Sequence, residues 1–164
     1  LLHVVTHKGA VVAPLIEDNS AETYALRILL ESEALRLAIP LLSENDIEQA
    51  GALIDALERE TDYTEIGRLN RLFHMTLYGK APNQRLLNLV EHGLNEEERF
   101  LRFNLEAMGL GETSQEDHRE LLSLVAQKKV EQSVLTLRNH LMRGMEVITH
   151  YLNSIEQDND KGPR

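Results

Sequence analysis

The sequence predicts an all-α protein, an antiparallel bundle of about six helices, preceded by a short β-hairpin. Three observations predict this fold class. Apolar residues recur at helical spacing from residue 20 to about residue 155, capping residues, glycines and prolines interrupt that pattern, and the intervening loops are short. Short loops between amphipathic helices favour antiparallel packing around one core, and 164 residues suit one domain.

The first 14 residues are the exception to the helical pattern. Val4-Val5-Thr6 and Ala10-Val11-Val12 are typical of short β segments, with a turn at His7-Lys8-Gly9. Pro14 ends the second segment because proline cannot donate to a β ladder. Since a lone hairpin is only marginally stable in water, we expect it to pack against another part of the protein.

Start and stop signals divide the rest of the chain into six helices. Ser20 and Asn83 are N-cap residues for the first and fourth helices. Ser43-Glu44-Asn45-Asp46 resembles a capping box for the second helix, and Thr113-Ser114-Gln115-Glu116 is one for the fifth. Pro40 is expected to kink or stop the first helix. The predicted ranges are about 20–42, 44–60, 63–78, 84–108, 113–128 and 130–155.

Composition and charge exclude several classes of protein. With 17 Lys and Arg against 27 Asp and Glu, the net charge is −10, which disfavours binding of a phosphate backbone across this bundle. The absence of cysteine excludes disulfides, cysteine-ligated zinc and thiol nucleophiles. No apolar run approaches the roughly 20 residues that span a bilayer, and no signal segment opens the sequence. We therefore expect a cytoplasmic protein with no membrane partner, and its first residue, Leu1, is consistent with a fragment or a processed product.

Four polar residues on the apolar faces of three predicted helices are candidates for a site. Asn70 and His74 lie four residues apart and share a helix face. His118 precedes an apolar stripe, and His140 lies between two leucines. Burying such a group without a partner costs roughly 1–3 kcal/mol. A shared divalent cation would satisfy all four, and imidazole suits zinc, nickel, copper or iron. The alternative is that each histidine bonds a backbone carbonyl or a carboxylate in the core.

Two arginines lie beside apolar residues and therefore need a partner or a route to solvent. Arg27 shares a helix face with Glu31, so its partner is either that carboxylate or a ligand. Arg102 lies between Leu101 and Phe103 and raises the same question. For both, the alternative is a side chain whose charged end reaches solvent.

Several of these residues occur within short motifs in a fixed order. The motifs are Arg27-x-x-x-Glu31, Asn70-Arg71-Leu72-Phe73-His74 before Ala81-Pro82-Asn83, Asp117-His118-Arg119-Glu120-Leu121, and Asn139-His140-Leu141. In that order they resemble the FCD-type effector-binding domain of the GntR family of bacterial transcription regulators. The resemblance covers about residues 20–155, and six helices are closer to the VanR-like branch of the family than to its seven-helix FadR-like branch.

The resemblance implies a metal and a ligand for the site. The metal ligands of the family match four positions, Asn70, His74, His118 and His140. Many members have Asp where this chain has Asn70, so the exchange removes one negative charge and is expected to weaken binding of the divalent cation, zinc or nickel. Effectors of the family are commonly small organic acids. Arg27 is the candidate for holding a carboxylate through two nitrogens, and Arg102 is a second candidate.

The resemblance also divides the chain into parts. Residues 1–14 resemble the end of the wing hairpin of a truncated winged helix-turn-helix domain, residues 15–156 the effector-binding domain, and residues 157–164 are a polar tail. The family implies a homodimer that binds operator DNA through the N-terminal domain, most of which we expect to precede residue 1. A bound acid would shift helices and change the spacing of the two DNA-binding heads.

Two other functions are compatible with the same residues. A metal-dependent hydrolase or oxygenase could use three histidines with open coordination positions to activate water. The sequence has no evident general base beside these residues and no Glu-x-x-His pair of the di-iron bundles, which disfavours this alternative. A plain interaction module with no ligand in its core is the third possibility.

Overall fold

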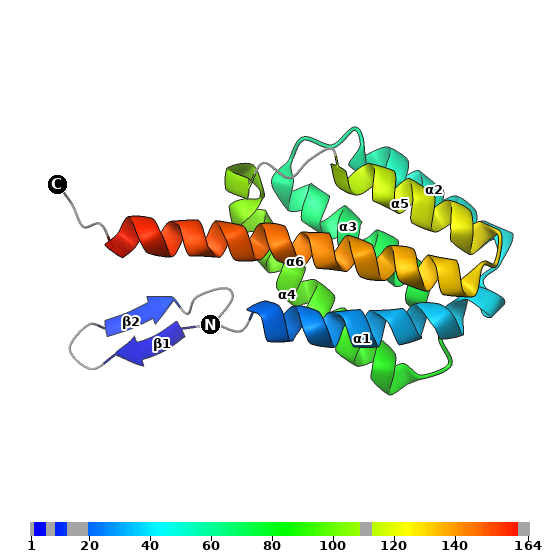
Figure 1. Cartoon of the computed structure of the whole chain (residues 1–164), viewed down its shortest axis with the longest axis horizontal. Coiled ribbons are helices and arrows are strands. Elements are labelled where there is room, and N and C mark those ends of the chain that lie inside the picture. The colour runs from blue at the N-terminus through cyan, green and yellow to red at the C-terminus, as the bar shows by residue number, and fades with distance from the viewer. Residues whose placement is uncertain (1, 6–8, 13–19, 109–112, 161–164) are drawn as a thin grey trace.

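The computed structural model describes residues 2–5, 9–12, 20–108 and 113–160 (Figure 1). Within these ranges it contains six α-helices, which confirms the all-α class and the number of predicted helices. The helical elements are α1 (Ser20–Ala38), the short 3-10 helix η1 (Ile39–Leu41), α2 (Glu44–Leu57), α3 (Tyr63–Tyr78), α4 (Gln84–Met108), α5 (Thr113–Ala126) and α6 (Val130–Asp160).

The helices pack as a bundle in which α1 and α6 lie side by side. α5 packs against α6 and α2, α3 packs against α2 and α4, and α1 also contacts α3 and α4. Figure 1 shows α6 running across the front of the bundle, with α1 along its lower side and α5 along its upper side. No described helix is both long enough and apolar enough to cross a membrane.

The predicted caps account for several helix boundaries. Ser43 Oγ accepts a hydrogen bond from the backbone N–H of Asp46, and the carboxylate of Asp46 accepts one from the backbone N–H of Ser43, so α2 begins with a capping box. Asn83 Oδ1 accepts from the N–H of Leu86 at the start of α4. Pro40 lies in η1, where α1 gives way to a 3-10 turn, as expected of a residue that removes a helical hydrogen bond.

Lys128 determines the turn between α5 and α6. Its φ of 56° lies in the left-handed region, so α5 ends at Ala126 rather than near residue 128 as predicted. Its Nζ donates to the carbonyl oxygens of Ile39 and Leu42 at 2.7 and 2.6 Å. These carbonyls belong to a helix end, where backbone acceptors lack a helical partner. The contact therefore ties the α5–α6 turn to the end of η1.

Two other helix ends differ from the prediction. α2 ends at Leu57 rather than near Glu60, whose carboxylate instead accepts hydrogen bonds from the backbone N–H groups of the next two residues. α6 extends to Asp160, past the predicted end at Ile155, so the beginning of the predicted polar tail is helical. Residues 161–164 lie outside the described part of the chain.

One apolar core receives side chains from all six helices. Its largest fully buried members are Leu35, Ile39, Ile54, Phe73, Leu77, Tyr78, Leu94, Leu121 and Leu137. A small group of polar and charged side chains is buried with them, namely Arg27, Glu31, His74, His118 and Ser133. Buried groups of this kind need partners, so they define where a site is to be sought.

The N-terminal segment contains two short strands. β1 (Leu2–Val5) and β2 (Gly9–Val12) form an antiparallel pair. The predicted turn at His7 and the closing Pro14 lie outside the described residues. A strand pair alone does not identify a winged-helix domain, so that assignment stays a prediction.

Candidate metal centre

Three histidines from three helices meet in the interior of the bundle. His74 lies on α3, His118 on α5 and His140 on α6, and one ring nitrogen of each lies within 4.8 Å of the others. The ring centroid of His74 is 5.2 Å from that of His118 and 5.4 Å from that of His140, and the latter two are 4.8 Å apart. His74 and His118 are fully buried and His140 is half-buried. The helices therefore bring together the three predicted imidazole ligands.

The apolar stripes of the helices turn these rings inward. On α3, His74 follows Phe73, a fully buried side chain whose ring centroid lies 5.2 Å from the ring of His74 and 4.5 Å from that of His118. On α5, buried Leu121 lies one turn after His118, and on α6 His140 lies between two buried leucines. Because the stripes pack into one core, their polar members are carried into it as well.

The Nδ1 atom of each histidine already has a hydrogen-bond partner. The partners are Tyr78 Oη, 3.1 Å from His74; Gln115 Oε1, 3.1 Å from His118; and Asp117 Oδ2, 3.3 Å from His140. The amide and carboxylate oxygens only accept, so His118 and His140 carry a proton on Nδ1 and, when neutral, keep a lone pair on Nε2. Outer hydrogen bonds of this kind orient metal-binding histidines.

The Nε2 atom of His118 tests whether the donor set fits a metal. This atom is buried and has no hydrogen-bond partner among the described residues. Leaving such an atom unpaired costs about 1–3 kcal/mol, whereas a neutral imidazole nitrogen with a free lone pair is a common metal ligand. The residues therefore fit a divalent transition metal ion bound by His74, His118 and His140.

Burial keeps two of the histidines neutral. It lowers the pKa of His74 and of His118 well below the ordinary value of 6.5, and neighbouring imidazoles of the cluster lower both values further. Conversely, hydrogen bonds from His140 and Arg143 lower the pKa of the Asp117 carboxyl to about 2, so it stays an acceptor. At neutral pH, protons therefore do not compete with a cation for His74 and His118.

Two further predicted site residues lie on α3 and α4. Asn70 is half-buried on α3, four residues before His74, and so lies on the same face of the helix. Its role as an oxygen ligand stays a prediction. Arg102 lies in α4, but its side chain is outside the part of the chain that the structure describes.

Arg27 is buried on α1, and both of its ion-pair partners are internal. Its Nε donates to Glu31 Oε1 at 2.8 Å and its Nη1 to Glu97 Oε1 at 2.6 Å. The guanidinium also lies 4.9 Å from the ring centre of Tyr24. Its Nη2 is buried without a partner among the described residues. Because Glu31 and Glu97 accept from Nε and Nη1, Nη2 is the nitrogen of Arg27 that stays available for a carboxylate, and the two-nitrogen contact stays a prediction.

Four residues of this network were not predicted from the sequence, Tyr78, Glu97, Gln115 and Asp117. Tyr78 lies four residues after His74, and Gln115 lies three residues before His118. These are the spacings at which side chains meet along a helix, so a signal for both contacts was present. Glu97 lies three residues after a buried leucine of α4, which is a comparable signal for an inward position.

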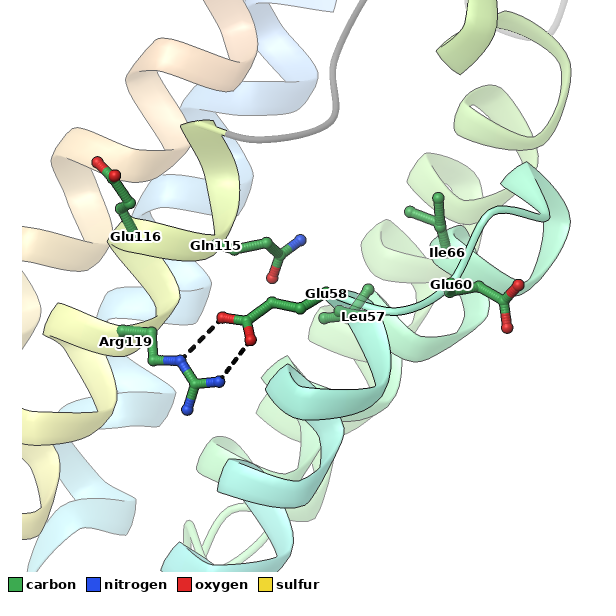
Figure 2. A pocket seen from close by; sticks show the side chains of 7 residues that line it. All are labelled: Leu57, Glu58, Glu60, Ile66, Gln115, Glu116 and Arg119. Carbon is green, nitrogen blue, oxygen red and sulfur yellow. Dashed lines mark hydrogen bonds and ion pairs between the residues drawn. The ribbon is translucent and has the colours of Figure 1, made fainter.

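A cavity of about 590 Å³ lies where the end of α2 and the starts of α3 and α5 meet (Figure 2). Figure 2 shows Gln115 extending from α5 toward Leu57 and Ile66, and the ion pair of Arg119 with Glu58 beside it. Gln115 is therefore both part of the cavity wall and the partner of His118 Nδ1. Gln115 therefore connects the wall of this cavity to the histidine cluster.

Residues 22–143 match the FCD domain family. Two curated relatives are transcription regulators. The chain is 30 % identical over 157 residues to the uncharacterized HTH-type transcriptional regulator YdhC of Bacillus subtilis (strain 168). That alignment covers 93 % of this chain and 70 % of the relative. It is 27 % identical over 173 residues to the Nta operon transcriptional regulator of Aminobacter aminovorans, and that alignment covers 99 % of this chain and 79 % of the relative.

Two solved structures are similar to the chain. One is a crystal structure of a transcriptional regulator, a GntR family member, from Pseudomonas syringae pv. tomato strain DC3000, with a TM-score of 0.84, 60 % identity, and coverage of 97 % of this chain and 67 % of that chain. The other is E. coli McbR/YncC, with a TM-score of 0.75, 22 % identity, and coverage of 91 % and 77 %. At that identity the second likeness shows the fold alone.

These similarities confirm the resemblance that the motifs suggested. They do not support the hydrolase or oxygenase alternative, because the relatives and the fold are those of transcription regulators and not of enzymes. The matched span contains Arg27 and all three histidines of the cluster. The chain therefore belongs to the FCD-domain group of the GntR family of transcription regulators.

Proposed function

We propose that this chain is the sensing part of a ligand-responsive transcription regulator whose bundle binds a divalent metal ion and a small carboxylate. One observation carries the proposal: two buried nitrogens with opposite requirements lack hydrogen-bond partners within the described part of the chain. Nε2 of His118 offers a lone pair, which suits a cation, and Nη2 of Arg27 offers an N–H, which suits an anion. Ser32 Oγ is the other buried side-chain atom without a partner among the described residues.

The metal ion would be held by three imidazoles and one amide oxygen, from His74, His118, His140 and Asn70. Imidazole nitrogens favour zinc or nickel over magnesium or calcium. Because all four ligands are neutral, the positive charge of the ion would not be compensated by its protein ligands. When bound, the ion would supply a Lewis acid that attracts a carboxylate.

Arg27 would provide the second contact to the acid. Its Nη2 can donate one hydrogen bond while its other nitrogens stay paired with Glu31 and Glu97. Arg27 donates to Glu31, Glu31 accepts from Tyr78, and Tyr78 lies 3.1 Å from His74, so two side chains in hydrogen-bond contact connect the two groups. A ligand of a few carbon atoms could therefore touch both the metal and the arginine. Arg102 remains a second candidate for this contact.

The rest of the regulator follows from the family. Operator DNA would be bound by a winged helix-turn-helix domain, of which residues 1–14 would be the end of the wing. The protein would act in the cytoplasm as a homodimer. Exposed Leu26 and Leu29 on α1 and Leu89 on α4, two helices in contact, supply apolar surface that a second copy could cover. Ligand-driven shifts of helices would then alter the separation of the two DNA-binding heads.

The proposal is tested by metal analysis of the purified protein and by isothermal titration with a panel of small carboxylates, with and without chelator. We expect one divalent ion for each chain and carboxylate binding that the chelator abolishes. A His74→Ala, His118→Ala double variant should lose both. The matched control is His92→Ala, since His92 is an exposed histidine of α4. Undiminished carboxylate binding by the double variant without detectable metal would refute the metal-dependent mechanism.

A further inference from the structure

A continuous chain of buried contacts links Arg27 to His74. Arg27 Nε donates to Glu31 Oε1 at 2.8 Å, Tyr78 Oη donates to Glu31 Oε2 at 2.9 Å, and Tyr78 Oη lies 3.1 Å from His74 Nδ1. The four side chains are 0–4 % exposed. They come from α1 and α3 only, so this series of hydrogen bonds crosses one helix interface. Water cannot replace any of its members without entering the core.

The direction of each hydrogen bond follows from the number of protons available. Arg27 can only donate, and Tyr78 has one hydroxyl proton, which it gives to Glu31. Toward His74 the hydroxyl of Tyr78 can therefore only accept. The proton in the remaining bond must then lie on Nδ1 of His74, which leaves Nε2 of the neutral ring with a lone pair.

We propose that Glu31 and Tyr78 are positioning residues that hold the proton of His74 on Nδ1 and so present Nε2 to a metal ion. The inference rests on the proposed metal centre and deepens it. The other two histidines are placed in the same tautomer by an oxygen that directly accepts from Nδ1, Gln115 for His118 and Asp117 for His140. His74 differs because its acceptor is a hydroxyl, which accepts only while Glu31 takes the hydroxyl proton.

This arrangement couples the two halves of the proposed ligand site. Glu31 accepts from Arg27 on one oxygen and from Tyr78 on the other. An anion that accepts from Nη2 of Arg27 shares the charge of the guanidinium with Glu31 and so changes the strength with which Glu31 accepts from Tyr78. Metal affinity and carboxylate affinity then depend on each other, and by linkage the dependence is equal in both directions.

The matched variants are Tyr78→Phe and Tyr24→Phe. Both tyrosines are buried, and both donate to a glutamate paired with Arg27. Tyr24 donates to Glu97, and among the described residues it makes no hydrogen bond or ring contact with a histidine of the cluster. Zinc titration calorimetry should show affinity reduced about 10–100-fold in Tyr78→Phe, the usual effect of losing an outer partner of a metal ligand. Tyr24→Phe should change it less than about twofold. Equal losses in the two variants would overturn the proposal.

Nitrogen NMR of the imidazole rings in metal-free protein gives a readout that a structural role would not move. Wild-type His74 should carry its proton on Nδ1. In Glu31→Gln the amide oxygen must serve Arg27, so the amide N–H faces Tyr78 and the hydroxyl donates to His74. His74 should therefore move its proton to Nε2, while Glu97→Gln, the control, should leave it on Nδ1.

Each outcome decides a separate statement. A wild-type His74 with its proton on Nε2, or an unchanged tautomer in Glu31→Gln, overturns the positioning role and needs no metal to do so. Failure of the wild-type protein to bind zinc or nickel overturns the proposed metal centre. The tautomer of His74 in the wild-type protein can be read whether or not the Tyr78→Phe and Glu31→Gln variants fold, because that measurement uses the wild-type chain.

Discussion

Two arginines of this chain each bind two carboxylates, yet their surroundings differ. The groups are Arg27 with Glu31 and Glu97, and Arg119 with Asp55 and Glu58. The side chain of Arg27 is 5 % exposed, whereas that of Arg119 is 46 % exposed. At the surface, water completes the hydrogen bonding of Arg119. In the core, Nη2 of Arg27 is buried away from solvent and has no hydrogen-bond partner among the residues that the structure describes.

The difference shows that burial, and not ion pairing, distinguishes the candidate site. Exposed ion pairs contribute little to stability because water already solvates both charges. A buried pair carries a large desolvation cost, and an additional unpaired N–H adds to it. An arrangement of that cost is expected where a ligand uses it.

The largest effect is expected from removing the buried arginine. In Arg27→Ala, Glu31 stays buried without its counter-charge, and breaking a buried ion pair costs about 3–5 kcal/mol. Urea denaturation followed by circular dichroism should show this loss in the free energy of unfolding. If Arg27→Ala proved no more destabilising than Arg119→Ala, burial would not be the distinguishing property.

The next effect concerns the histidines beside Arg27. Zinc at a hundred times its dissociation constant should stabilise the folded protein by about 2.7 kcal/mol. The gain should disappear in His118→Ala, which removes the buried nitrogen without a partner, and persist in the exposed control His92→Ala. Thermal unfolding with and without zinc measures it. Stabilisation that survives in His118→Ala would place the ion elsewhere.

A pH dependence should sharpen the same contrast in metal-free protein. Because burial lowers the pKa of His74 and His118 in the folded state, the unfolded chain binds protons that the folded chain does not. Stability should therefore fall as the pH drops below about 6.5, with a slope that approaches about 1.4 kcal/mol per pH unit for each histidine. Urea titrations with chelator between pH 7.5 and 5 test this. A profile as steep in His74→Gln, His118→Gln would assign the effect to other groups.

The smallest effect is expected at the exposed arginine. Arg119→Ala should leave the free energy of unfolding within the error of urea denaturation, because solvent replaces its contacts with Asp55 and Glu58. Zinc affinity should also stay unchanged. A loss comparable to that of Arg27→Ala would show that the two ion-pair groups are energetically alike.

Local features of this chain were predictable because they depend on near neighbours. Ser43 and Asn83 cap their helices with their own side chains. Pro40 follows the end of α1 because proline has no backbone N–H to donate to a helical hydrogen bond. The left-handed Lys128 was not predicted, since its conformation depends on carbonyls of residues far away in the sequence. The helical extension of α6 to Asp160 was also missed, because a polar composition alone does not exclude a helix.

The helices, their inward faces and the three histidines could be predicted from the amino-acid sequence, because each follows from spacing along one helix. Three features depend on the packing of the helices: ring nitrogens of the three histidines lie within 4.8 Å of one another, Glu97 pairs with Arg27, and Tyr78 connects Glu31 to His74. These contacts connect residues from different helices, and their distances depend on how the helices pack. Burial is likewise a property of the assembled bundle, and it is burial that distinguishes Arg27 from Arg119 and keeps His74 and His118 neutral by lowering the pKa of each.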